Sequence, residues 1–303
     1  MEQLDYVIVD VFTDTALAGN PLAVVTDTVG LETARMQAIA REFNLSETTF
    51  VQRRSTTQEE AEGVRVRIFT TQEELPFAGH PTLGTASVLK MFSADAVRDN
   101  TVRLGLNVGV VPVRFRASAS GSDALFGEMT QRDPEFGAEL DPAEVARITG
   151  LAADDIEPSV PPQVVSTGTA FAIVALRSAH GLARLKVNHD QATAYLRDRG
   201  GRWFYVLAPE PQQNGNGPRL YRARMQFYGG EDPATGSAAG CAISYLVGRG
   251  LVPEGDRIHL RQGIEIGRPS DIFLSARREK SKVTDVRVGG STVLVARGRL
   301  HLP

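Results

Sequence analysis

The sequence predicts an α/β (α+β) protein built from two similar halves, each a curved, mostly antiparallel sheet around one central helix. First, residues 80–86 (HPTLGTA) are nearly repeated at residues 232–238 (DPATGSA), 152 residues later in a chain of 303. Second, strand patterns outnumber helix patterns. Third, each half contains one prominent apolar helix pattern. A period this long exceeds that of solenoid repeats and indicates two copies of a whole domain.

Two flanking pairs of segments extend the repeat in the same order. Residues 19–25 (GNPLAVV) resemble residues 168–174 (GTAFAIV), and residues 102–104 (VRL) resemble residues 258–260 (IHL). The offset stays near 150 residues throughout. We therefore expect the two halves to share their order of strands and helices.

The length and composition fit two domains with separate cores. We expect an N-terminal half at residues 1–115 and a C-terminal half at residues 116–289, with a strand at about 290–303 that returns to the first half. The length matches two domains of ordinary size. A hydrophobic content of 42% is enough to form a core in each.

Composition also narrows the class of function. The net charge of −3 offers no basic surface for nucleic acid. No apolar run reaches 18 residues, so we expect no membrane span, and the acidic start does not have the pattern of a signal peptide. Cys241 is the only cysteine, which excludes an intrachain disulfide and favours a cytoplasmic protein. Cys241 lies in an apolar helix pattern, so we expect a buried, structural thiol.

In the first half, β-rich runs alternate with helical patterns. Strands are predicted at residues 6–11, 22–25, 48–52, 64–70 and 101–115, and helices at residues 31–43 and 81–92. The second helix has Pro81 in its first turn, with His80 placed to cap it. Glu59 and Glu60 are expected in a solvated turn.

The second half repeats this plan. Strands are predicted at residues 163–176, 203–208, 219–227, 258–266 and 272–276, and a helix at residues 233–247. Pro233 is expected at the start of that helix with Asp232 as its cap, and Gly248 and Gly250 close it.

Two similar helix starts that face one cleft would bind an anion. The first turn of a helix leaves backbone N–H groups without partners, and the helix dipole favours negative charge there. We expect Gly84 and Gly236 to let a ligand approach the backbone, and Thr85 and Ser237 to add hydroxyl donors. The expected ligand is a small molecule that carries a carboxylate.

The residues at the two caps, together with Glu47, suggest acid–base chemistry. His80 can titrate near neutral pH, and Asp232, with Glu231 beside it, can carry a charge or share a proton. Glu47 lies at a helix-to-strand junction among apolar and hydroxyl-bearing residues, a setting suited to proton transfer. No metal-ligand spacing and no nucleotide-binding motif is present. Tautomerisation, isomerisation or epimerisation therefore fits better than hydrolysis.

Several longer motifs resemble the PhzF-like family of phenazine-biosynthesis isomerases. They are residues 10–12 (DVF), 44–48 (NLSET), 68–70 (IFT), 74–81 (ELPFAGHP), 231–238 (EDPATGSA) and 262–263 (QG). The resemblance runs nearly end to end. It implies a diaminopimelate-epimerase-like fold with the site between the halves, a homodimer, and no metal or organic cofactor. Where diaminopimelate epimerases carry two cysteines, this chain has Gly79 and Asp232, which argues against a two-thiol racemase.

The resemblance also implies a role for each site residue. Glu47 would move a proton from one ring carbon of a dihydro-hydroxyanthranilate to another, and the resulting enol would relax to a ketone. His80 and Asp232 would assist. The substrate and its carboxylate would be held by residues from both halves, namely Asn20, Ser46, Gly79, Thr235, Gly236 and Ser237.

The sequence leaves the substrate and one aspect of the chemistry open. The segment before the Glu-Asp-Pro motif, residues 225–230, is shorter than in family members, so we expect a reshaped pocket. Candidates are the phenazine precursor, a precursor of alkylated proline units, or another small unsaturated cyclic acid. An amino-acid epimerase using Glu47 and Asp232, and a non-catalytic metabolite-binding protein, are the alternatives.

Overall fold

The chain forms two compact units, each of the expected α/β type. The computed structural model describes residues 2–116, 123–211, 217–227 and 230–302. Unit 1 comprises Met1–Thr130 with Gly289–Pro303, and unit 2 comprises Gln131–Val288. The expected boundary after residue 115 falls within strand β8 (Gly109–Arg116), which pairs with β9 (Leu125–Thr130) inside unit 1.

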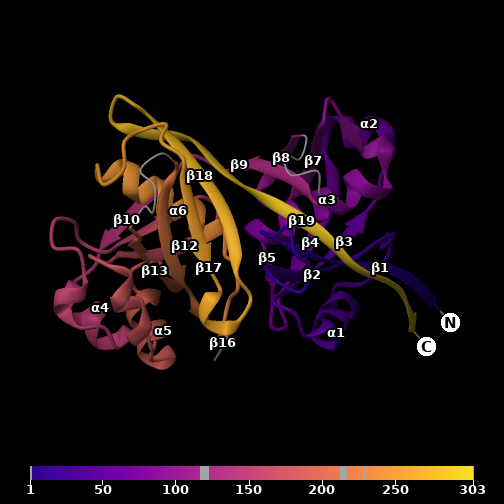
Figure 1. The fold of residues 1–303 in the computed structure, drawn as a ribbon. Helices are drawn as coiled ribbons and strands as arrows, with labels where there is room; N and C mark the ends of the chain where they lie inside the picture. The colour runs from indigo at the N-terminus through magenta and orange to yellow at the C-terminus, as the bar shows by residue number, and fades with distance from the viewer. Residues whose placement is uncertain (1, 117–122, 212–216, 228–229, 303) are drawn as a thin grey trace. The chain divides into compact units, whose positions relative to one another are not determined.

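Eight strands of unit 1 close a mixed barrel in the order β9–β8–β7–β4–β3–β2–β1–β19 (Figure 1). The remaining strands are β1 (Glu2–Val11), β2 (Asn20–Val25), β3 (Glu47–Gln52), β4 (Val64–Phe69), β7 (Thr101–Leu106) and β19 (Lys282–Leu302). The pairs β2–β3 and β4–β7 are parallel, whereas β1–β2, β3–β4, β7–β8, β8–β9 and β1–β19 are antiparallel.

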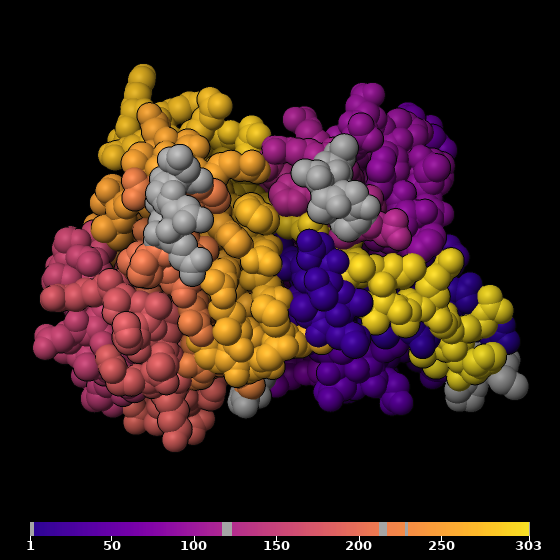
Figure 2. Space-filling view, in the orientation of Figure 1, coloured from indigo at the N-terminus to yellow at the C-terminus, as the bar shows by residue number. Residues whose placement is uncertain are grey.

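The C-terminal strand joins the N-terminal one. Glu2 lies opposite Leu302 and Val11 lies opposite Thr292, with one irregularity after Ile8. Figure 2 shows the yellow C-terminal segment against the indigo N-terminal one on the surface of unit 1. The last strand therefore closes the barrel of the first half.

Helix α3 (Gly79–Phe92) fills this barrel. Its residues from Gly79 to Leu89 are all buried, and it packs on β1, β2, β3, β7, β8 and β9. A helix that is apolar on every face is stable only when it is surrounded, and the barrel surrounds it. The helix begins two residues earlier than predicted. His80 therefore lies inside its first turn, and Ala78 is the N-cap.

Helices α1 (Thr33–Phe43) and α2 (Thr56–Glu62) lie outside the barrel. The predicted helix at residues 31–43 is confirmed as α1, and Asn44 ends it in the left-handed conformation. The solvated turn expected at Glu59 is wrong, because a capping box of Ser55 and Gln58 starts α2 there. Three shorter elements complete the unit: β5 (Glu74–Leu75), η1 (Ala94–Ala96) and β6 (Val97–Arg98).

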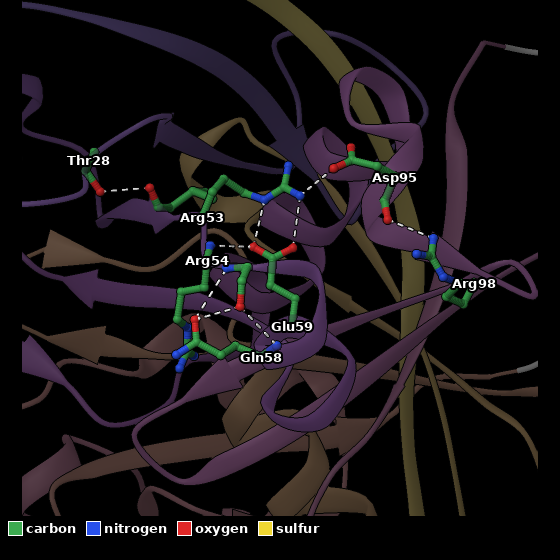
Figure 3. A network of polar contacts seen from close by, with 9 residues as sticks. Thr28, Arg53, Arg54, Gln58, Glu59, Asp95 and Arg98 are labelled. Carbon is green, nitrogen blue, oxygen red and sulfur yellow. Dashed lines mark hydrogen bonds and ion pairs between the residues drawn. The ribbon is translucent and has the colours of Figure 1, made fainter.

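Glu59 anchors α2 to the barrel through Arg53 (Figure 3). The two side chains form a two-point ion pair with N–O distances of 2.8 and 2.9 Å. Arg53 also donates to Asp95 at 2.6 Å, and the backbone N–H of Arg54 donates to Glu59 at 2.8 Å. A fork-shaped pair of this kind fixes the orientation of both side chains.

Unit 2 repeats the plan around helix α6 (Gly236–Gly248). Its sheet runs in the order β10 (Glu135–Glu139), β11 (Gln163–Ser166), β12 (Ala170–Ala175), β13 (Trp203–Pro209), β14 (Arg219–Arg224), β17 (Ile258–Gln262) and β18 (Ser270–Glu279). Residues from Gly236 to Val247 are buried, and α6 packs on β11, β12, β13 and β18. The peripheral elements are α4 (Pro142–Thr149), η2 (Ala153–Asp155), η3 (Ala179–Arg184), α5 (His189–Arg197), β15 (Gln226–Phe227), β16 (Gly230–Glu231) and η4 (Ile264–Ile266).

The strand pairings of the two units correspond one to one. The series β1–β2–β3–β4–β7–β8 and β11–β12–β13–β14–β17–β18 both pair antiparallel, parallel, antiparallel, parallel and antiparallel. In both, the buried helix connects the second parallel pair. The internal repeat predicted from the sequence is therefore a repeat of topology.

Three long strands predicted in the second half are interrupted. Residues 163–176 form β11 and β12, residues 219–227 break at Met225, and β17 ends at Gln262. The last break has a clear cause, because Gly263 adopts a positive φ of 76°. In the described part of the chain, no helix has the length and apolar character needed to cross a membrane.

Candidate active site

Three of the predicted site residues meet at one end of the barrel in unit 1. Asn20 begins β2, Glu47 begins β3, and His80 lies in the first turn of α3. Because β2 and β3 are parallel, their starts lie at the same end of the sheet, with Leu22 opposite Glu47. Asn20 Nδ2 lies 3.2 Å from His80 Nδ1, and His80 Nε2 lies 3.5 Å from Glu47 Oε2. All three side chains are buried.

The contact with Asn20 determines which ring nitrogen of His80 carries the proton. An amide nitrogen donates and does not accept, so His80 Nδ1 is the acceptor and the ring proton lies on Nε2. That nitrogen faces Glu47. Burial lowers the pKa of His80 to about 3, so the imidazole is neutral at pH 7. The expectation that His80 titrates near neutral pH is wrong; its chemistry is that of a neutral N–H donor.

This burial has a measurable effect on stability. The unfolded chain protonates His80 near pH 6.5, whereas the folded chain does so only near pH 3. Protonation therefore favours the unfolded state as the pH falls through this window. From pH 7 to pH 5 we expect the free energy of unfolding to fall by about 2 kcal/mol more in wild type than in His80→Gln, measured by urea denaturation. Equal falls in both proteins would contradict the buried neutral imidazole.

The other two predicted residues of unit 1 flank this group. Ser46 is half-buried directly before β3, and Gly79 is the first residue of α3. The N-cap Ala78 supplies no side-chain acceptor to the first turn. Because His80 in this first turn lies beside Glu47, the start of α3 is at the same end of the barrel as Glu47.

Gly84 does not have the role that the repeat suggested. A Cβ atom on Gly84 would lie 2.6 Å from Leu22 Cδ2 and 2.7 Å from Val11 Cγ2. The missing side chain lets α3 approach β1 and β2 closely. The expectation that a ligand approaches the backbone at Gly84 is therefore wrong.

In unit 2, the predicted residues gather at the start of α6. Thr235 is the N-cap, Gly236 and Ser237 open the helix, and Asp232 precedes the cap by three residues. Pro233 therefore does not start the helix, and Asp232 does not cap it. The side chains of Asp232, Thr235 and Ser237 are all buried. Thr235 donates its hydroxyl to Asp232 Oδ2 at 2.6 Å instead of bonding to its own helix.

Glu231 is committed to an ion pair. Arg224 binds both of its carboxylate oxygens, at 2.9 and 2.6 Å, and also donates to the backbone carbonyl of Leu182 at 2.6 Å. This pair holds the strand that precedes Asp232. The segment at residues 225–230, which was expected to reshape the pocket, contains β15 and the first residue of β16, which pair antiparallel; Tyr228 and Gly229 lie outside the described residues.

One buried residue of this region was given no role by the sequence. Gln262 bonds to Tyr205, Thr235 and Asp232, and its side chain is fully buried. It belongs to the Gln-Gly pair at the end of β17. The positive φ of Gly263 is the local reason why the strand turns there.

Cys241 is buried in α6, as expected of a structural thiol. Burial raises its pKa to about 11, and its sulfur lies 3.5 Å from the Thr167 hydroxyl. A protonated thiol is a poor nucleophile. We expect Cys241→Ala to keep kcat within about threefold of wild type and iodoacetamide to leave the native thiol unlabelled at pH 8. Rapid labelling with loss of activity would contradict this assignment.

Metal-ligating side chains do not cluster in the described part of the chain: no group of three or more His, Cys, Asp or Glu residues could hold an ion there.

Comparison with known proteins identifies the family. The sequence profile of phenazine biosynthesis-like proteins, PhzC-PhzF, matches residues 9–298. The chain belongs to the PhzC-PhzF family. An uncharacterized isomerase from Mesorhizobium japonicum is 36% identical over 312 residues, with all of both chains covered. The trans-2,3-dihydro-3-hydroxyanthranilate isomerase of Pseudomonas aeruginosa is 36% identical over 300 residues, covering 98% of this chain and 99% of the relative.

A solved structure confirms that this PhzC-PhzF protein shares an epimerase-type fold. A protein described as a predicted epimerase from Pseudomonas aeruginosa superposes with a TM-score of 0.82 at 34% identity, over 99% of this chain and 100% of the other. The relatives that span the chain are named isomerases. The expectations of a PhzF-like family member and of an isomerase are both confirmed.

Proposed function

We propose that this protein is a cofactor-independent isomerase that moves a proton within a small unsaturated cyclic carboxylic acid of secondary metabolism. Glu47 removes the proton from one carbon and returns it to another. His80 and Asp232 assist. The backbone around Gly236 and Ser237 holds the carboxylate, with Ser46 and Gly79 nearby, and Asn20 and Thr235 also bind the substrate. The joint action of groups from both units is part of this proposal.

The observation that supports it most is the buried group of Glu47, His80 and Asn20. His80 Nε2 lies 3.5 Å from Glu47 Oε2, close to the carboxyl but without a formed hydrogen bond between the two atoms, so a small movement would let it donate. Asn20 holds the ring so that this nitrogen faces Glu47. A buried carboxyl with a neutral donor nearby and little water around it is suited to taking a proton from carbon and returning it.

Relatives provide the first substrate to test. The match to the trans-2,3-dihydro-3-hydroxyanthranilate isomerase covers 99% of that relative, so the acid in its name is the first substrate to test. Purified protein is incubated with that acid, and the product is followed by absorbance and mass spectrometry. Formation of an isomer of unchanged mass supports the proposal. Absence of turnover with this acid and with related cyclic enoic acids, including precursors of alkylated prolines, would refute it.

An amino-acid epimerase is the second candidate, because one structural relative is described as a predicted epimerase. It would use Glu47 and Asp232 on opposite faces of one carbon. Chiral chromatography of amino acids, proline derivatives included, after incubation with the protein separates the two functions. The isomerase names of the relatives favour both enzymes over a non-catalytic binding protein.

We also propose a cytoplasmic homodimer, on the basis of the family and the single cysteine. Light scattering after size-exclusion chromatography tests the dimer. A mass near 32.7 kDa would contradict it.

A further inference from the structure

A chain of buried polar side chains in unit 2 ends on Asp232. It begins at Tyr205 of β13, continues through Gln262 at the end of β17, and reaches Asp232 through Thr235. Tyr205 and Gln262 are completely buried, and Thr235 and Asp232 are at most 7% exposed. Buried groups of this kind are stable only when their hydrogen bonds are matched, so the direction of each bond can be worked out.

Two backbone groups fix the orientation of the Gln262 amide. The backbone N–H of Thr235 lies 3.2 Å from Gln262 Oε1, and the backbone carbonyl of Asp232 lies 2.8 Å from Gln262 Nε2. A backbone N–H can only donate and a carbonyl can only accept, so a flipped amide would face both with the wrong atom. Tyr205 then donates its hydroxyl to Oε1 at 2.8 Å.

The amide in turn fixes the hydroxyl of Thr235. Gln262 Nε2 lies 2.9 Å from Thr235 Oγ1. An amide nitrogen can only donate, so Thr235 Oγ1 accepts this hydrogen bond. The hydroxyl proton of Thr235 must therefore be donated to an acceptor other than Gln262. Asp232 Oδ2 lies at 2.6 Å and Met225 Sδ at 3.2 Å, and a thioether is the weaker acceptor. The hydroxyl therefore donates to Asp232.

We propose that Gln262 is a positioning residue that, through Thr235, holds Asp232 Oδ2 as a hydrogen-bond acceptor. The O–H···O distance of 2.6 Å is that of a well-formed hydrogen bond to a carboxyl oxygen. Asp232 thus enters the reaction with Oδ2 already occupied as an acceptor. This role of Asp232 rests on the proposed function; the direction of the bonds does not.

The direction of the bonds can be observed without a substrate. Neutron diffraction from deuterium-exchanged crystals of the wild-type protein locates the deuterons. We expect the Thr235 deuteron on the line to Asp232 Oδ2 and the Gln262 ND2 group beside the Asp232 carbonyl. A Thr235 deuteron that points to Met225 or to Gln262 would overturn the proposal.

Steady-state kinetics test whether Gln262 supports catalysis by positioning Asp232. Gln262→Glu keeps the side-chain shape but turns the donor into an acceptor, which would draw the Thr235 hydroxyl away from Asp232. We expect kcat to fall at least about tenfold with KM changed less than about threefold. Thr235→Val should lower kcat similarly, and the double variant should lose no more than Thr235→Val alone.

The controls separate positioning from packing. Ser270→Ala removes another buried hydroxyl, which donates to the carbonyl of Pro233 at 2.9 Å, and we expect wild-type kcat. If the fall in kcat of the double variant equals the product of the two single falls, Gln262 does not act through Thr235. Wild-type protein that turns over no candidate acid would instead refute the proposed function, and the neutron result would still decide the bond directions.

Discussion

Glu47→Gln is expected to lower kcat for isomerisation by about 10³-fold while KM changes less than about threefold. The amide has nearly the shape of the carboxyl but can neither take up a proton from carbon nor return one. Glu47 is only 8% exposed, so solvent water is poorly placed to replace it. Stopped-flow or steady-state absorbance with the dihydro-hydroxyanthranilate gives both constants.

A matched control is the same change at an exposed glutamate. Glu144→Gln on α4 removes a carboxyl that is 45% exposed and pairs with Arg147 across one helical turn. We expect its kcat to equal that of wild type, because such surface pairs contribute little. If Glu47→Gln and Glu144→Gln behave alike, Glu47 is not the proton carrier.

Gly263→Ala is expected to destabilise the protein by about 3 kcal/mol or more and to lower the melting temperature of unit 2 by roughly 5–10 °C. Gly263 has a φ of 76°, where a side chain is strained. A Cβ there would also lie 2.4 Å from the carbonyl oxygen of Arg268 and 2.6 Å from that of Pro233. Both contacts are with backbone, so the loop that carries Asp232 would have to move.

Gly255→Ala separates strain from crowding. Gly255 has nearly the same φ, 78°, but nothing lies within 4 Å of its ideal Cβ. We expect a loss of only about 1 kcal/mol there, from the left-handed backbone alone. Calorimetry of the two variants gives the comparison. Equal melting temperatures would show that backbone crowding around Gly263 does not contribute to stability.

The sequence repeat predicted the topology well but placed the helix starts incorrectly. Helix α3 begins at Gly79, before the repeated motif, whereas α6 begins at Gly236, in its second half. The first four residues of the pattern are thus helical in one copy and irregular in the other. Propensity and spacing describe which residues suit a helix. They do not show that the Asp232 carbonyl and the Thr235 hydroxyl accept hydrogen bonds from Gln262, far along the chain.

In the candidate site too, the sequence predicted which residues take part but not the contacts that determine their state. Asn20, Glu47 and His80 could be nominated from motifs, and the parallel pairing of β2 and β3 explains why they meet. The neutral state of His80 could not be predicted, because it depends on burial by the whole barrel. Gln262 was missed because its partners, the Tyr205 and Thr235 hydroxyls and two backbone groups, are distant in the sequence. The Gln-Gly pair at a strand end was the available signal.

Glu59 shows how a visible signal can be overlooked. The sequence Ser-Thr-Thr-Gln at residues 55–58 is a helix-starting pattern, and the structure forms that capping box. The neighbouring acidic residues suggested a solvated turn instead. The ion pair with Arg53 gives Glu59 a structural role, since the pair ties α2 to the end of β3.

The proposed transfer of a proton from carbon by Glu47 can be tested most directly with an isotope. The substrate carries deuterium at the ring carbon that loses its hydrogen, and NMR follows that position with wild-type protein and with Glu47→Gln. The account predicts that wild type removes the deuterium with a primary isotope effect and forms the ketone, whereas Glu47→Gln leaves it in place. Removal of the deuterium at the same rate by both proteins would contradict it.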